Sequence, residues 1–148
     1  METKTASTIK DLIVINNDRC NGYKTAAEEA KDADLKAMFH EFSQQSEKFA
    51  QELRTFLPAG EEQPSSDETK NTGKLYRVWM DIKAAVTGND RKAILSSCEY
   101  GEDHAKKHYN DAVEHPEALP ADALSVIQRQ RNEVLKGHDK VKAMRDSA

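Results

Sequence analysis

Apolar residues recur at intervals of three and four along most of this 148-residue chain. That spacing places side chains on one face of an α-helix, and it predicts a helix wherever it is sustained. Each such helix must bury its apolar face against another, so the sequence predicts an all-α fold, a four-helix bundle in a single domain spanning residues 1–148. The predicted helices cover about residues 7–31, 33–56, 90–114 and 120–145, with a shorter one at 74–87.

Local signals place the ends of these helices. Thr8 and Asp11 have the spacing of a capping box at the start of the first helix. Asn89 or Asp90 is positioned to cap the helix that begins near residue 90. His115 stops that helix, because the proline after it disfavours helical geometry in the preceding residue.

The connection between the second and third long helices determines the topology. It contains a loop over residues 58–73, rich in proline, glycine and acidic residues, and then the short helix at 74–87. So long a connection lets the chain travel the length of the bundle, which leaves the two long helices parallel. This is the ferritin-like arrangement, a four-helix bundle with one long crossover.

Composition narrows the range of functions. The net charge of −4 disfavours non-specific adhesion to nucleic acid or to a membrane, because both are anionic. No apolar run reaches the roughly 20 residues needed to span a bilayer, and the segment from Met1 to Lys4 is not that of a signal peptide. We therefore expect a cytoplasmic protein with no nucleic-acid or membrane partner. Cys20 and Cys98 are far apart within helical patterns, which is typical of buried thiols.

Several motifs are similar to those of a known family. The chain resembles a bacterial family of four-helix-bundle proteins in the ferritin-like superfamily, catalogued as a domain of unknown function. The resemblance covers about residues 7–146. It implies the ferritin-like fold and implies no reaction. The motifs that carry it are residues 16–19, 22–23, 26–29, 49–53, 79–85, 87–90 and 98–103.

Polar residues interrupt the apolar stripes near the helix centres, and these are Asn16, Ser46, Glu102 and His138. A buried carboxylate or imidazole needs a hydrogen-bonding partner, a metal ion or a shifted pKa. Di-iron carboxylate bundles carry Glu-x-x-His on two helices, and this tetrapeptide occurs nowhere in the sequence. The sequence therefore does not predict the six-ligand di-iron cage.

Two interpretations of these polar residues remain open. In one, Glu99, Glu102 and His138 bind a single metal ion, iron or manganese. In the other, Glu102 belongs to a polar layer of the core. There it accepts hydrogen bonds from one of four side chains, those of Asn16, Tyr23, His138 or Arg131. His104 and His108, four residues apart, have the spacing of a surface chelate, but the lysines between them mark a solvated face.

The sequence favours a non-enzymatic structural or interaction protein, associated with stress by analogy alone, with a degenerate metal site, no catalytic residues and no cofactor. The alternative is a metal-dependent oxidase or peroxide-handling protein that uses iron or manganese. A third reading is a small-ligand module with a pocket near Trp79. Association into a homo-oligomer is compatible with all three.

Overall fold

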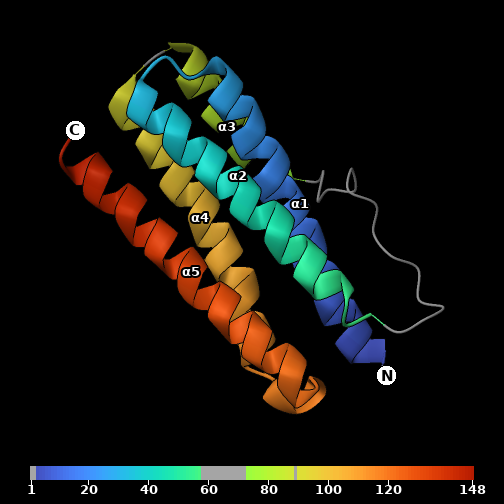
Figure 1. The fold of residues 1–148 in the computed structure, drawn as a ribbon. Coiled ribbons are helices and arrows are strands. Elements are labelled where there is room, and N and C mark those ends of the chain that lie inside the picture. Colours follow the sequence, from blue (N-terminus) through green and yellow to red (C-terminus); the bar gives the residue numbers. More distant parts are fainter. Residues whose placement is uncertain (1–2, 58–72, 89) are drawn as a thin grey trace.

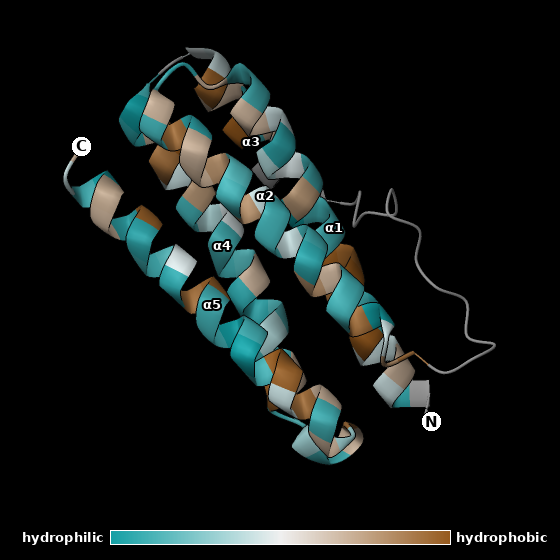
Figure 2. Cartoon of the chain, in the orientation of Figure 1, coloured by the Kyte–Doolittle hydropathy of each residue, from teal (hydrophilic) through white to brown (hydrophobic). Residues whose placement is uncertain are grey.

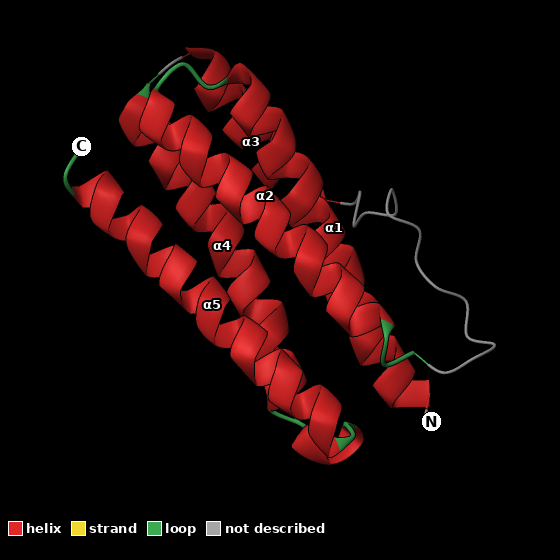
Figure 3. Ribbon diagram, in the orientation of Figure 1, coloured by secondary structure: helices red, strands yellow, loops and turns green. Residues whose placement is uncertain are grey.

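A computed structural model describes residues 3–57, 73–88 and 90–148 (Figure 1). The described residues form helices and connecting turns without a strand (Figure 3), so the all-α prediction is confirmed. The predicted loop at 58–73 lies outside them, except for Gly73, which begins a helix. The helices are α1 (Thr3–Glu29), α2 (Ala33–Arg54), α3 (Gly73–Gly88), α4 (Arg91–Val113) and α5 (Ala121–Asp146), with a 3-10 turn at Pro116–Ala118.

The helices pack as two antiparallel pairs, α1 with α2 and α4 with α5. In Figure 1, α2 and α4 run in the same direction, as the long connection predicts. The helix in that connection, α3, packs on α4 and α1. Because α1 contacts α2, α3 and α4, it is surrounded on most sides, and the whole run from Leu12 to Arg19 is buried.

The ends of the helices show where local signals are reliable. Asp90 caps α4 as predicted, since its side chain accepts a hydrogen bond of 3.1 Å from the backbone N–H of Ala93. The predicted capping box at Thr8 is wrong, because α1 already begins at Thr3 and the Thr8 hydroxyl donates to the carbonyl of Lys4 within the helix. The extra turn is anchored by Thr5, whose hydroxyl donates to the carbonyl of Ala118.

Two apolar clusters make up the core. One includes Ile9, Leu53, Ile127 and Val134, and the other includes Phe39, Phe42, Ile94 and Val141. Hydrophilic residues cover much of the outer faces of α2 and α5 (Figure 2). Between the two clusters, polar side chains from all four long helices meet, and this polar layer leads to the candidate site.

Candidate functional site

The centre of the bundle holds an ion pair between Arg19 of α1 and Glu102 of α4. Nε of Arg19 donates to Oε2 of Glu102 at 2.8 Å, and Nη2 donates to Oε1 at 2.7 Å. The two side chains are only 2% and 0% exposed. This two-pronged geometry is the strongest that a guanidinium and a carboxylate can adopt.

The guanidinium makes two further hydrogen bonds. Nη1 of Arg19 donates to the Gln45 side-chain oxygen at 2.9 Å and to the Ser46 hydroxyl at 2.8 Å, both on α2. The guanidinium carbon lies 5.0 Å from the ring centre of Phe42 and 5.6 Å from that of Tyr23, within the range of cation–π attraction. The buried cation is therefore held by partners on three sides.

The fourth long helix, α5, reaches this pair through Gly137. A methyl group placed on Gly137 would lie 3.5 Å from Nη2 of Arg19, 3.5 Å from Oε1 of Glu102 and 3.4 Å from the Phe42 ring. The backbone of α5 therefore passes close to the ion pair and helps to cover it.

Titration behaviour follows from this burial. Burial acts to lower the pKa of Arg19, but the charge of Glu102 and its hydrogen bond outweigh burial and raise that pKa. Burial, and then the negative charge of Glu102, raise the pKa values of the Tyr23 hydroxyl and the Cys98 thiol. Cys98 is thus a protonated, unreactive thiol of the core, as predicted. Cys20 is only partly buried.

A second chain of hydrogen bonds continues the polar layer. Nδ2 of Asn16 donates to the Tyr109 hydroxyl at 2.8 Å, and that hydroxyl donates to the side-chain oxygen of Gln130 at 2.7 Å. The predicted polar layer is therefore present, although three of the partners proposed for Glu102 bind elsewhere. Those bonds join Asn16 to Tyr109, Arg131 to Asn110, and His138 to Asp103.

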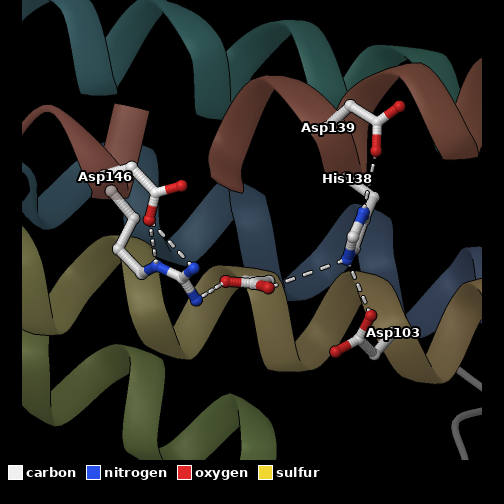
Figure 4. A network of polar contacts seen from close by, with 6 residues as sticks. Asp103, His138, Asp139 and Asp146 are labelled. Atoms are coloured by element: carbon white, nitrogen blue, oxygen red, sulfur yellow. Dashed lines mark hydrogen bonds and ion pairs between the residues drawn. The ribbon is translucent and has the colours of Figure 1, made fainter. Parts of the chain in front are cut away.

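A different cluster of ionisable groups lies at the seam between α4 and α5 (Figure 4). Nε2 of His138 is 2.8 Å from Oδ1 of Asp103 and 3.9 Å from Oε1 of Glu99. The three residues each offer one ligand atom, and these atoms all lie within 4.8 Å of one another. No other group of three or more such side chains in the described part of the chain is this close.

The helices place these three side chains by simple spacing. Glu99 and Asp103 are four residues apart on α4, so they lie on the same face, and His138 points at them from α5. Glu99 and His138 are 15% and 12% exposed, whereas Asp103 is 48% exposed and opens the cluster to solvent.

Neighbouring charges orient the cluster. Nδ1 of His138 lies 3.2 Å from Oδ1 of Asp139, which directs Nε2 toward Asp103 and Glu99. On the other side, Nη1 of Arg145 donates to Oε2 of Glu99, and Arg145 also donates twice to Asp146, at 3.0 and 3.3 Å. These bonds to Asp146, followed by the charge of Glu99, raise the pKa of Arg145.

Two carboxylates and one imidazole are a donor set for a single divalent ion. In the metal-free protein, a hydrogen bond with one shared proton joins Nε2 of His138 to Oδ1 of Asp103, which are 2.8 Å apart. A metal ion takes the place of that proton. Ligand bonds near 2.1 Å require the three atoms to draw closer than 4.8 Å, and Asp103, at 48% exposed, is the least enclosed of the three side chains.

The structure separates the residues predicted as ligands. Glu99 and His138 come together, whereas Glu102 lies in the core with both oxygens bonded to Arg19. The residue not chosen from the sequence is Asp103. The four-residue step from Glu99 to Asp103 is a signal that identifies them as neighbours, whereas Glu102 follows the buried stripe of α4.

The other sequence-based candidates lie apart from this cluster. His108 pairs with Asp11, with Nδ1 2.8 Å from Oδ2, and His104 packs edge-on against the Tyr100 ring. His104 and His108 therefore have separate surroundings. The side chain of Trp79, near which a ligand pocket was predicted, lies outside the described residues.

Comparison with known families shows which family the chain belongs to. The model of one family matches residues 4–115, which is α1 through the end of α4. The chain belongs to the family described as domain of unknown function (DUF2383). The DUF2383 match includes Glu99 and Asp103 and ends before His138. Comparison with curated proteins found no match. In the described residues, no helix combines the length and apolar character needed to cross a membrane.

Proposed function

We propose that this protein is a non-enzymatic helical bundle of ferritin-like type that binds one divalent transition-metal ion through Glu99, Asp103 and His138. The observation that carries the proposal is the approach of His138 Nε2 to carboxylate oxygens of both Asp103 and Glu99. The bundle itself then has a structural or interaction role in the cytoplasm, and its metal site is reduced to the α4–α5 seam.

The core ion pair supports a reduced site. Buried carboxylates at the centre of a bundle are the ligands of ferritin-like di-iron proteins. Here the buried carboxylate is Glu102, and its charge is neutralised by Arg19. The guanidinium of Arg19 therefore neutralises the buried carboxylate, as a metal ion would otherwise do. The donors that remain for an ion are the three of the α4–α5 seam.

A single ion also favours binding over oxidase chemistry. Two-metal catalysis needs ligands that hold two ions roughly 3.5–4 Å apart. Three donors of one atom each suit one ion, with water in the remaining positions. This assignment predicts that the bound metal supports no turnover.

A second candidate, a metal-dependent oxidase or peroxide-handling protein that uses iron or manganese, is favoured by the exposure of Asp103. Its side chain is 48% exposed, so water or a small oxidant has access to an ion held there. An accessible coordination position is what distinguishes catalytic from closed metal sites.

Metal analysis tests the proposal. Protein purified without an affinity tag is dialysed against Zn²⁺, Mn²⁺ or, without oxygen, Fe²⁺, and its metal content is measured. We expect one ion per chain in the wild type, at least about tenfold weaker binding in His138→Ala, and unchanged binding in the control His115→Ala, which removes a histidine that is 56% exposed.

The same preparations separate the two candidates. Absence of metal from the wild type, or equal retention by His138→Ala, would overturn the proposed site. Consumption of peroxide or oxidation of Fe²⁺ that disappears in His138→Ala and persists in His115→Ala would replace the non-enzymatic assignment with the oxidase.

A further inference from the structure

The carboxylate of Glu99 is divided between two cations. Its Oε1 faces Nε2 of His138 at 3.9 Å, while its Oε2 accepts a hydrogen bond from Nη1 of Arg145. Arg145 is in turn fixed by Asp146, the last residue of α5, which accepts bonds of 3.0 and 3.3 Å from Nη2 and Nε. In Figure 4, Asp146 and His138 stand at the two ends of this row of contacts.

Building on the proposed function, we infer that Arg145 limits Glu99 to a single metal-binding oxygen and thereby makes the seam site selective for a small four-coordinate ion such as Zn²⁺. Arg145 is a positioning residue in this inference, since it acts on the ion through Glu99. Mn²⁺ and Ca²⁺, which need more oxygen ligands, are disfavoured.

The coordination chemistry of the ions explains the selectivity. With Oε2 held by Arg145, the site offers one oxygen from Glu99, one from Asp103 and one nitrogen from His138. Three such ligands and one water complete the tetrahedral shell of Zn²⁺. Mn²⁺ prefers six ligands and Ca²⁺ six to eight, and both commonly take a carboxylate through both oxygens.

The charge of Arg145 acts in addition to its geometry. A guanidinium beside the site repels every divalent cation, so it weakens Zn²⁺ and Mn²⁺ binding alike. Charge alone therefore changes both affinities and leaves their ratio nearly constant. Restriction of Glu99 to one oxygen changes the ratio, and the ratio is the quantity to measure.

The experiment compares wild type with Arg145→Gln, Arg145→Lys and Lys136→Gln. Lys136 is an exposed cation of α5 paired with Glu133, so Lys136→Gln is a control for loss of one positive charge. Arg145→Lys keeps the charge but lacks the two-pronged fork that holds Glu99 and Asp146 together. Dissociation constants for Zn²⁺ and Mn²⁺ are measured by titration, and Co²⁺ absorption reports the coordination number.

We expect Arg145→Gln to tighten Mn²⁺ binding by about tenfold or more and Zn²⁺ binding by clearly less. Arg145→Lys should lower the preference for Zn²⁺ without a change in net charge. Co²⁺ should show the intense bands of tetrahedral coordination in wild type and in Lys136→Gln, and the weak bands of six-coordination in Arg145→Gln.

Each outcome has a separate meaning. An unchanged Zn²⁺-to-Mn²⁺ ratio in both Arg145 variants overturns the role of Arg145 while leaving the proposed metal site standing. Failure of wild type and all variants to bind any of the ions overturns the proposed function. If Arg145→Gln does not fold, as judged by circular dichroism, the conservative Arg145→Lys decides the question.

Discussion

Arg19 and Glu102 are separated by 83 positions in the chain and are joined by two hydrogen bonds of 2.7 and 2.8 Å in the middle of the bundle. Their charges cancel in a region that solvent does not reach. Removing two ions from water is costly, and the cost is recovered only when every donor and acceptor finds a partner. With the contacts to Gln45 and Ser46, four of the five N–H groups of Arg19 have an acceptor.

Loss of the Glu102 charge should therefore strongly destabilise the fold. Glu102→Gln leaves the guanidinium of Arg19 buried without an anion, and we expect a loss of about 3–5 kcal/mol in the free energy of unfolding. Chemical denaturation monitored by circular dichroism measures it. The double variant Arg19→Met with Glu102→Leu removes both charges and should be much closer to wild type. A loss under about 1 kcal/mol in the single variant would contradict the buried pair.

Substitutions at Gly137 test the close approach of α5. A methyl group there meets its neighbours at 3.4–3.5 Å, which is ordinary contact, and alanine is the better helix former. Gly137→Ala should therefore be neutral or stabilise by up to about 1 kcal/mol. Gly137→Leu drives a larger group toward Phe42 and Arg19 and should cost about 1–3 kcal/mol. Equal thermal stability of the two variants would show that this space is not tight.

Acid should remove the contribution of the ion pair between Arg91 of α4 and Asp34 in the first turn of α2. The hydrogen bond from Arg91, at 2.6 Å, lowers the pKa of Asp34 below its ordinary value of 3.8. Because the folded-state pKa is the lower one, the pair stabilises the fold above the unfolded pKa, and the effect is lost as pH falls through the folded pKa.

We expect Arg91→Ala to lower the unfolding free energy by about 1 kcal/mol or less near neutral pH, since the pair is exposed. The difference from wild type should shrink in acid, as pH falls below 3.8, the ordinary pKa of Asp34. Denaturant titrations at both pH values measure it, with Lys31→Ala as the control for loss of an exposed charge at the same turn. A difference that grows in acid would rule out this linkage.

The helices were predictable because their apolar spacing is local information. The bounds of the helices were less predictable. Tertiary contacts of Thr5 extend α1 toward the N-terminus, beyond the local signal at Thr8. The burial of Glu102 followed from its register on α4, since Cys98, Ala105 and Tyr109 share its stripe.

The partners of Glu102 were harder to predict, because pairing depends on how helices far apart in the sequence come together. Arg19 does carry a signal: the steps from Leu12 to Asn16, Arg19 and Tyr23 are four, three and four residues, which is the spacing of one helix face. A cation and an anion predicted on two inward stripes are natural partners. The grouping of His138 with both Glu99 and Asp103 could not be predicted, since no sequence pattern fixes which part of α5 lies beside these two residues.

The polar layer between the two apolar clusters has a further effect on how the chain can assemble. Apolar side chains are nearly interchangeable as neighbours, so a bundle held by them alone can slide one helix along another by a turn of about 5.4 Å at little cost. Here a slip of one turn would place Arg19 opposite Phe42 or Phe49 in place of Ser46, or opposite Cys98 or Ala105 in place of Glu102. The buried pair of Arg19 and Glu102 therefore favours one register of the helices over the others.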